Sequence, residues 1–175
     1  MQIIYKVKGG LKGYIETFEE TEPEKPERCV NCGGRKFYKW GKYHRYSVGE
    51  DSAELIPIRR FCCAKCGRTG SHLPDFCLSG KQYMVDFVMK LIGTLIYLGK
   101  VCEEGMERQI YRYKKRFMEK LPLFVTFLRG KGFGAFPEGR KERAQVIFGA
   151  LSSLHQAGEL MDSFFSGTGQ HFLAG

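Results

Sequence analysis

The longest helical pattern lies in the middle of the chain. Apolar residues recur there at steps of three and four and form one broad face: Met84, Phe87, Val88, Leu91, Ile92, Leu95 and Leu98. This spacing predicts a helix from Lys81 to Leu98. Asp86 and Lys90 interrupt the apolar stretch, which falls short of the roughly 20 residues needed to span a membrane. We therefore expect a buried helix and no membrane anchor.

A narrower stripe predicts a second helix, from Met106 to Lys120, after breaks at Gly99 and Gly105. At about 100° per residue, one side carries the apolar residues Met106, Ile110, Tyr113 and Phe117. Pro122 marks the end of this helix. Further helical patterns cover residues 123–128 and 138–156, and the glycine-containing end of the chain, 167–175, is expected to be a flexible tail.

The N-terminal half has the shorter patterns of β-strands. Ile3–Val7 and Tyr14–Phe18 are β-rich runs separated by glycines, which predicts a hairpin or two edge strands. Residues 19–27 are polar, contain two prolines and are expected to be a linker. From Cys29 to Pro74, three aromatic or β-branched runs (36–40, 43–48 and 53–61) alternate with glycine-containing turns, which predicts a small antiparallel β unit.

These patterns predict an α+β protein. We expect an N-terminal β segment and linker at 1–28, a small antiparallel β module at 29–78, an all-helical domain at 79–166 and the tail at 167–175. With 175 residues, of which 43% are hydrophobic, the chain can bury a core but has room for one domain or two small ones. A large catalytic domain does not fit beside a second module.

The positive charge is concentrated in the middle of the chain. The whole sequence has 28 basic and 19 acidic residues, a formal net charge of +9. Residues 29–80 hold 9 basic and 4 acidic residues, and residues 81–120 hold 9 and 5, so these segments contribute +5 and +4. Such a balance favours polyanionic partners, and any polyanion site is expected in this part of the chain.

Four cysteines have the spacing of a structural zinc site. Cys29-Val-Asn-Cys32 and Cys63-Ala-Lys-Cys66 are two C-x2-C pairs, and each is followed by a glycine that lets the backbone curl toward the sulfurs. Four thiolates suit tetrahedral zinc, and strands between the pairs can bring them together, as in a zinc ribbon. The alternatives are cysteines without metal and a redox dithiol, which needs only one pair.

Other residues near these pairs are open to more than one interpretation. Cys62 adjoins the second pair and could take the place of Cys63, although Cys63 keeps the two-residue spacing. His72 is close enough to be a substitute ligand. Cys77 and Cys102 lie in apolar surroundings, where a free cysteine is usually a small buried hydrophobe.

The second predicted helix has a cationic side opposite its apolar stripe. Arg108, Arg112, Lys115 and Arg116 lie on that side, with Gln109 on its flank. After the turn at Gly105, this is the pattern of a helix-turn-helix recognition helix, although a charged face is also what an ordinary surface helix presents. The β module adds Lys39, Lys42 and Arg45 to the candidate DNA contacts.

The segment from Cys29 to Tyr83 resembles the zinc-ribbon module near the N-terminus of many prokaryotic insertion-sequence transposases and related transposon-encoded proteins. The shared features are the two cysteine pairs, the run Ile58-Arg59-Arg60 before Cys63, the sequence Gly67-Arg68-Thr69 after Cys66, and Leu73-Pro74-Asp75-Phe76. The resemblance implies a helix-turn-helix that grips duplex DNA, and Gln109 to Phe117 looks like its recognition helix. It covers about half the chain.

The resemblance does not extend to catalysis. Transposases of this type use three separated carboxylates, and the aspartates of this chain fall in no recognisable catalytic strand: Asp51, Asp75, Asp86 and Asp162. Four thiolates also leave zinc no open position for water. We therefore expect no enzymatic activity, no small-molecule substrate and no catalytic residue in this chain.

The sequence thus predicts a cytoplasmic, nucleoid-associated DNA-binding component of a prokaryotic mobile element, since its N-terminus has no signal-peptide pattern. One alternative is an adaptor that docks on a separate transposase or other nucleic-acid-processing subunit. Another is an RNA-binding ribbon that stacks bases on Trp40, Tyr43 and Tyr46.

Overall fold

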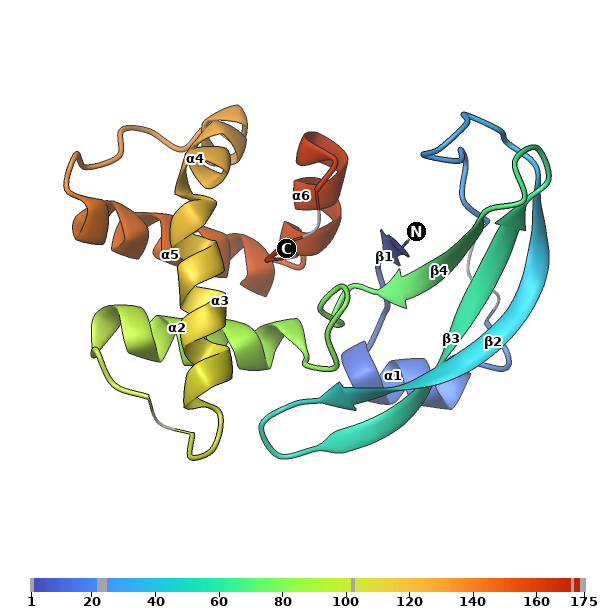
Figure 1. Cartoon of the computed structure of the whole chain (residues 1–175), viewed down its shortest axis with the longest axis horizontal. Coiled ribbons are helices and arrows are strands. Elements are labelled where there is room, and N and C mark those ends of the chain that lie inside the picture. Colours follow the sequence, from blue (N-terminus) through green and yellow to red (C-terminus); the bar gives the residue numbers. More distant parts are fainter. Residues whose placement is uncertain (1, 22–24, 102, 171, 174–175) are drawn as a thin grey trace. The chain divides into compact units, whose positions relative to one another are not determined.

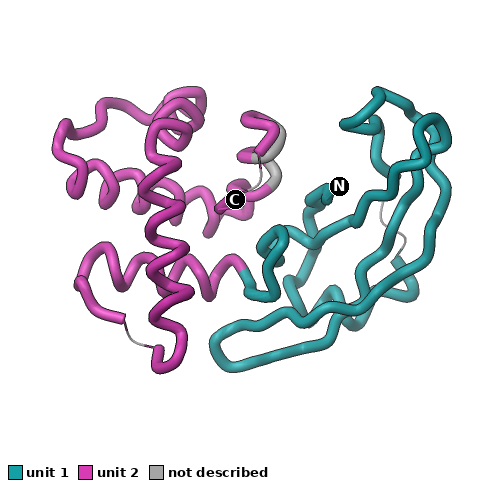
Figure 2. The backbone as a smooth tube through the Cα atoms, viewed as in Figure 1, with its two compact units in different colours: residues 1–84 teal, residues 85–175 magenta. Residues whose placement is uncertain are grey.

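The computed structural model describes residues 2–21, 25–101, 103–170 and 172–173. It divides the chain into two compact units, residues 1–84 and residues 85–175, coloured separately in Figure 2. The sequence placed the change from strands to helices at residue 78, a few residues before this division. The N-terminal residues, which the sequence set apart as a segment of their own, lie in the first unit.

The first unit contains, in its described part, a four-stranded mixed sheet with the order β1-β4-β3-β2 (Figure 1). β2 (Phe37–Val48) and β3 (Ala53–Cys63) form a long antiparallel hairpin, and β4 (Thr69–Pro74) pairs antiparallel with β3. This confirms the antiparallel β unit. β1 (Gln2–Tyr5) pairs parallel with β4, which is why the N-terminus belongs to this unit.

The strand predicted at Tyr14–Phe18 is wrong, because these residues lie in and directly after helix α1 (Gly10–Thr17). Leu11, Tyr14 and Phe18 are spaced by three and four, so one side of a helix carries all three into the core. Tyr14 and Phe18 are only 4% and 6% exposed. They pack with Ile56, Ile58, Leu73 and Phe76 of the same unit.

The second unit consists, in its described part, of five helices: α2 (Val85–Tyr97), α3 (Glu107–Glu119), α4 (Leu121–Gly130), α5 (Arg140–Gln156) and α6 (Leu160–Thr168). The first four confirm the helices expected near these positions, whereas α6 was not predicted. The interior of the second unit is rich in phenylalanine. Four such residues are at most 1% exposed: Phe117, Phe124, Phe164 and Phe172.

In its described residues, 167–170 and 172–173, the end of the chain is not the flexible tail that the sequence predicted; residues 171, 174 and 175 lie outside the described part. Phe172 and Leu173 are buried, and the ring of Phe172 lies 5.5 Å from that of Phe124 and 5.7 Å from that of Phe164. The glycines in this segment suggested fraying, but two large apolar side chains fix it against the helices by burial.

Helix α2 is buried on most sides and packs against α3 and α5. This agrees with the buried helix expected from its broad apolar face. No helix in the described part of the chain is long and apolar enough to span a membrane.

Candidate metal centre

Two matching backbone turns bring the four predicted ligands together at one end of the β2–β3 hairpin. In the first turn, the N–H of Cys29 donates to the carbonyl of Gly34, and the N–H of Gly33 donates to the carbonyl of Cys29. In the second turn, the N–H of Cys63 donates to the carbonyl of Arg68, and the N–H of Gly67 donates to the carbonyl of Cys63. Gly33 and Gly67 have φ of 68° and 67°, a left-handed conformation that favours glycine.

The four sulfurs have the spacing of a tetrahedral metal site. The Sγ atoms of Cys29, Cys32, Cys63 and Cys66 all lie within 4.8 Å of one another. The Cys29–Cys66 distance is 3.7 Å and the Cys32–Cys63 distance is 3.6 Å. Zinc–sulfur bonds of about 2.3 Å in a tetrahedron place sulfurs about 3.8 Å apart, whereas a disulfide needs about 2.05 Å. The residues therefore fit a four-coordinate ion.

The environment of the sulfurs favours thiolates at the second cysteine pair. The backbone N–H of Cys66 donates to the Cys63 sulfur, and the backbone N–H of Arg68 donates to the Cys66 sulfur. These bonds lower the pKa of both thiols, to about 6 for Cys66. The N–H of Gly34 lowers the pKa of Cys32, but burial and hydrogen bonds with the other three thiols raise it to about 12. A cation among the sulfurs would offset the mutual repulsion of four thiolates.

Apolar side chains enclose the cluster. Cys29 and Cys63 are 2% and 1% exposed and pack with Phe37 and Phe61, while Cys32 and Cys66 are half-buried at the edge of the group. Gly34 lies directly over the sulfurs: a Cβ there would come within 3.1 Å of the Cys63 Sγ and 3.3 Å of the Cys32 Sγ. A glycine at this position is therefore part of the site.

The structure separates the four predicted ligands from their possible substitutes. Cys62 is buried and its thiol lies 3.3 Å from the carbonyl oxygen of Gly67, outside the group of four sulfurs. His72 is also outside it, stacked on Tyr5 at 4.6 Å and edge-on to Phe61. Cys77 is fully buried, as expected for a small hydrophobe. Cys102 lies outside the described residues.

The predicted cationic row of α3 faces solvent. Ile110, Tyr113 and Phe117 are at most 1% exposed, whereas Arg108, Arg112 and Lys115 are exposed and Gln109 and Arg116 are half-buried. Lys115 lies 3.9 Å from Glu119 on the same helix, an exposed pair that contributes little. The helix thus separates apolar and cationic sides as its periodicity indicated.

The basic residues of β2 are more engaged with the protein than those of α3. Lys42 makes an ion pair of 2.6 Å with Glu19, and the half-buried Arg45 donates to the carbonyl of Leu78. Lys39 is exposed. Trp40 and Tyr46 are 58% and 55% exposed, while Tyr43 packs against the core of the unit.

Comparison with known proteins gives a match to a family model. A family model described as "Domain of unknown function (DUF6431)" matches residues 29–113. The matched segment begins at the first ligand, Cys29, includes both cysteine pairs and α2, and ends within α3. No curated protein and no solved structure matches the chain.

Proposed function

We propose that this chain is a zinc-stabilised protein that binds duplex DNA through α3. The four-thiolate site is a structural zinc centre of the zinc-ribbon kind, and its full coordination shell leaves no position for catalytic water. As in the transposase modules that the sequence resembles, the chain would recognise DNA for a mobile element without cutting it. Its place would be the nucleoid of a prokaryotic cell.

The observation that carries the proposal is the two-sided character of α3. Its apolar residues Ile110, Tyr113 and Phe117 are fully buried, so the helix is fixed in the unit and its opposite side is held outward. Arg108 and Arg112 lie on that outward side, one turn apart. Guanidinium groups at this spacing are suited to phosphates and to base edges in the major groove.

The connection before α3 is longer than in the usual helix-turn-helix. Residues 98–106 separate α2 from α3, whereas the common motif uses a turn of about 3 to 4 residues. The proposal therefore rests on the exposed cationic side of α3 and on the α2–α3 pair, with a longer loop between the helices. The family match runs through the cysteine pairs and into α3, which supports a shared role for the two parts.

Charge reversal on α3 tests the proposal. Arg108→Glu with Arg112→Glu changes the charge by −4 and leaves the buried stripe intact. The matched control is Arg140→Glu with Lys141→Glu, two exposed basic residues in the first turn of α5. Since hydrogen bonds to charged groups contribute about 1.5–3 kcal/mol each, we expect the first variant to bind duplex DNA roughly a hundredfold more weakly. Equal losses in both variants would contradict a specific role for α3.

A protein-binding adaptor is the second candidate, and one apolar patch favours it. Tyr97 and Leu98 at the end of α2 are 50% and 68% exposed, and Val146 on α5 is 45% exposed. The hydroxyl of Tyr97 donates to the carbonyl of Gln145, the residue before Val146 in α5. A partner such as a transposase subunit that docks here would lose affinity on Leu98→Ser and would be insensitive to salt, unlike a DNA complex.

A further inference from the structure

Two large aromatic side chains stand exposed on β2, at the end of the hairpin that carries the cysteine cluster. Tyr38 and Trp40 are 53% and 58% exposed, although both lie within a strand of the sheet. Exposed aromatic rings beside basic groups are the usual platform on which single-stranded nucleic acids stack their bases. We propose that these two rings, with Lys36 and Arg60, bind single-stranded DNA; the choice of DNA over RNA rests on the duplex-binding function proposed above.

The pairing of the strands places Tyr38 and Arg60 on one face of the sheet. Tyr38 is the partner of Cys62 on β3, and Cys62 is the partner of Thr69 on β4. Because side chains alternate along a strand, Arg60 shares the face of Cys62. Its guanidinium donates to the Thr69 hydroxyl at 2.8 Å. The neighbours of Tyr38 across the sheet are therefore small side chains, which is consistent with the exposure of its ring.

An irregularity in β2 brings Trp40 to the same region. The register between β2 and β3 shifts between Lys39 and Lys42, so the two residues in this interval, Trp40 and Gly41, stand opposite Arg60 alone. Bulges of this kind re-aim side chains and are frequent beside functional sites. Gly41 has φ of 90°, and a Cβ added there would meet nothing within 4 Å. The surface next to Trp40 is therefore unobstructed.

The charges around the two rings suit a polyanion. The Lys36 ammonium lies 5.7 Å from the centre of the Tyr38 ring, and Lys36 is exposed. Arg60 keeps its full charge, because the group that accepts its hydrogen bond is a neutral hydroxyl. The segments 29–49 and 55–74, which include both cysteine pairs, contain no acidic residue. The phosphates of a strand stacked on the rings would thus meet cations and no carboxylate from these segments.

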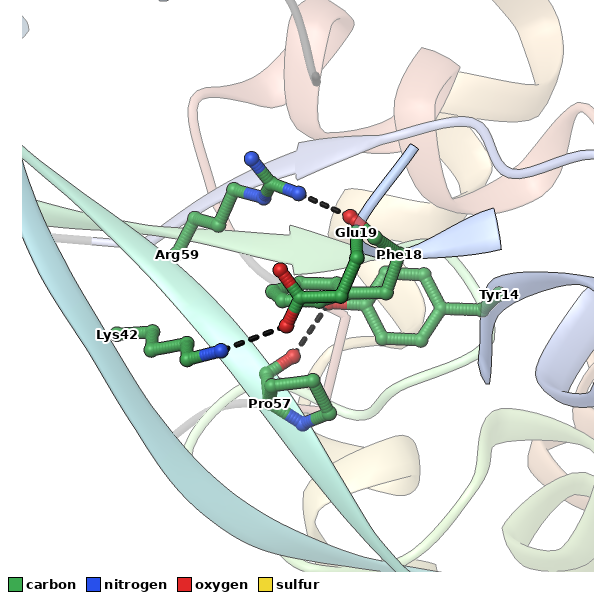
Figure 3. A network of polar contacts seen from close by, with 6 residues as sticks. All are labelled: Tyr14, Phe18, Glu19, Lys42, Pro57 and Arg59. Atoms are coloured by element: carbon green, nitrogen blue, oxygen red, sulfur yellow. Dashed lines mark hydrogen bonds and ion pairs between the residues drawn. The ribbon is translucent and has the colours of Figure 1, made fainter. Parts of the chain in front are cut away.

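The opposite face of the same strands is already covered by the end of α1. Arg59 donates to the carbonyl of Phe18, and Lys42 bonds to Glu19 (Figure 3). A pocket of about 330 Å³ lies there, between the end of α1 and the β2–β3 hairpin. The cations of that face are engaged with the protein, whereas the face of Tyr38 presents its ring to solvent.

The structure distinguishes among the aromatic residues that the sequence offered for stacking. Tyr43 packs against the core of the first unit. Tyr46 is the partner of Leu55, and the alternation of β3 puts Leu55 on the face of Arg59. Of the three residues, Trp40 alone remains beside Tyr38. Tyr46 is 55% exposed on the same strand, so it provides a matched control.

Trp40 is the only tryptophan of the chain, so its fluorescence reports binding directly. A single-stranded deoxyuridine oligonucleotide should quench this fluorescence in the full, zinc-loaded chain, because a base stacks on the indole. Tyr38→Ala should weaken the binding at least about fivefold, whereas Tyr38→Phe and Tyr46→Ala should each leave it within about twofold. Lys36→Gln should flatten the slope of log affinity against log salt by about 0.7, the contribution of one phosphate on a single strand.

An absence of quenching, or equal losses in Tyr38→Ala and Tyr46→Ala, would overturn the proposal. Oligouridine differs from the probe only in its 2′-hydroxyls, and at least about tenfold tighter binding of oligouridine would overturn DNA as the ligand. Should Tyr38→Ala lose its zinc, Trp40→Ala replaces it, with binding followed by the anisotropy of a labelled oligonucleotide.

The same variants separate this site from the duplex-binding proposal. Arg108→Glu with Arg112→Glu should lose duplex affinity and keep the quenching by the single strand. Tyr38→Ala should keep duplex affinity, because the faces of paired bases are stacked on one another within a duplex and cannot reach the ring. Loss of both activities in Tyr38→Ala would overturn the assignment of a separate single-strand site.

Discussion

Gly34 shows how one residue can decide whether a metal site forms. Its missing side chain leaves room for sulfurs from both cysteine pairs. In Gly34→Ala, contacts of 3.1 and 3.3 Å would push these sulfurs apart by a few tenths of an ångström, beyond the roughly 0.2 Å that zinc sites tolerate.

Metal analysis of the purified wild-type chain should find about one zinc per chain. We expect the Gly34→Ala chain to bind zinc at least about tenfold more weakly, in competition with a chromophoric chelator. Gly134→Ala is the control, because a Cβ there would meet nothing within 4 Å. Zinc affinity that is unchanged in Gly34→Ala would mean that the four sulfurs are not the ligands.

His72 predicts a dependence of stability on pH. Burial lowers the pKa of His72 from 6.5 to about 4, and its Nδ1 atom has no hydrogen-bond partner in the described part of the chain. The unfolded chain therefore takes up the proton first, so the free energy of unfolding should fall as the pH drops from about 6.5 to about 4. At about 1.4 kcal/mol per pKa unit, the total loss from this residue is on the order of 3 kcal/mol.

His72→Phe separates this effect from acid release of the metal. Phenylalanine keeps an aromatic ring between Tyr5 and Phe61 but takes up no proton. Urea unfolding of both proteins between pH 7 and pH 4 should show a shallower decline for the variant. Parallel declines would show that the cysteines alone account for the acid sensitivity.

At the scale of single elements, two glycines of the helical unit should respond in opposite directions. A Cβ at Gly93 of α2 would lie 2.8 Å from the buried Phe148 ring, whereas one at Gly149 of α5 would come no closer than 3.6 Å to the Tyr97 hydroxyl. Gly93→Ala should destabilise the unit by about 1–3 kcal/mol through overpacking. Gly149→Ala should stabilise it by up to about 1 kcal/mol through helix propensity. Thermal unfolding measures both.

The helices with a long periodic pattern of apolar residues were predicted from the sequence, whereas the short helix α1 was not. α2 and α3 carry three or more turns of consistent periodicity, so both were predicted within a few residues. The eight residues of α1 are too short for this, and Ile15 beside Tyr14 made the run look like a strand, although Ile15 is 45% exposed. The parallel pairing of β1 with β4 joins residues about 70 positions apart, which no local pattern records.

The candidate sites also differ in how far the sequence predicted them. The cysteine spacing predicted that these four residues come together, because each C-x2-C pair is local and the two turns only have to face each other. The pocket between the end of α1 and the β2–β3 hairpin was not predicted, since it combines separate elements and lies beside a register shift in β2. Lys42 was expected to meet DNA, but its ion pair with Glu19 appears only in the fold.

At the scale of the whole molecule, the proposal gives the two units separate tasks. Zinc bound by the four cysteines would stabilise the first unit, since structural zinc contributes about 10 kcal/mol or more in small peptides. Cys66→Ser should therefore release zinc and disorder that unit. Cys77→Ser should keep the metal, because Cys77 is not one of the four clustered cysteines and packs in a different buried group. NMR spectra of the Cys66→Ser chain that retain all signals of the sheet would contradict a structural role for the metal.

The salt dependence of duplex DNA affinity tests the central claim most directly. If Arg112, Lys115 and Arg116 each meet a phosphate, replacing all three by alanine removes three contacts while the buried side of α3 stays intact. Each contact contributes about 0.9 to the slope of log affinity against log salt, so the slope should flatten by about 2.7. An affinity and a slope that match the wild-type chain would mean that α3 does not bind DNA, and the adaptor function would take its place.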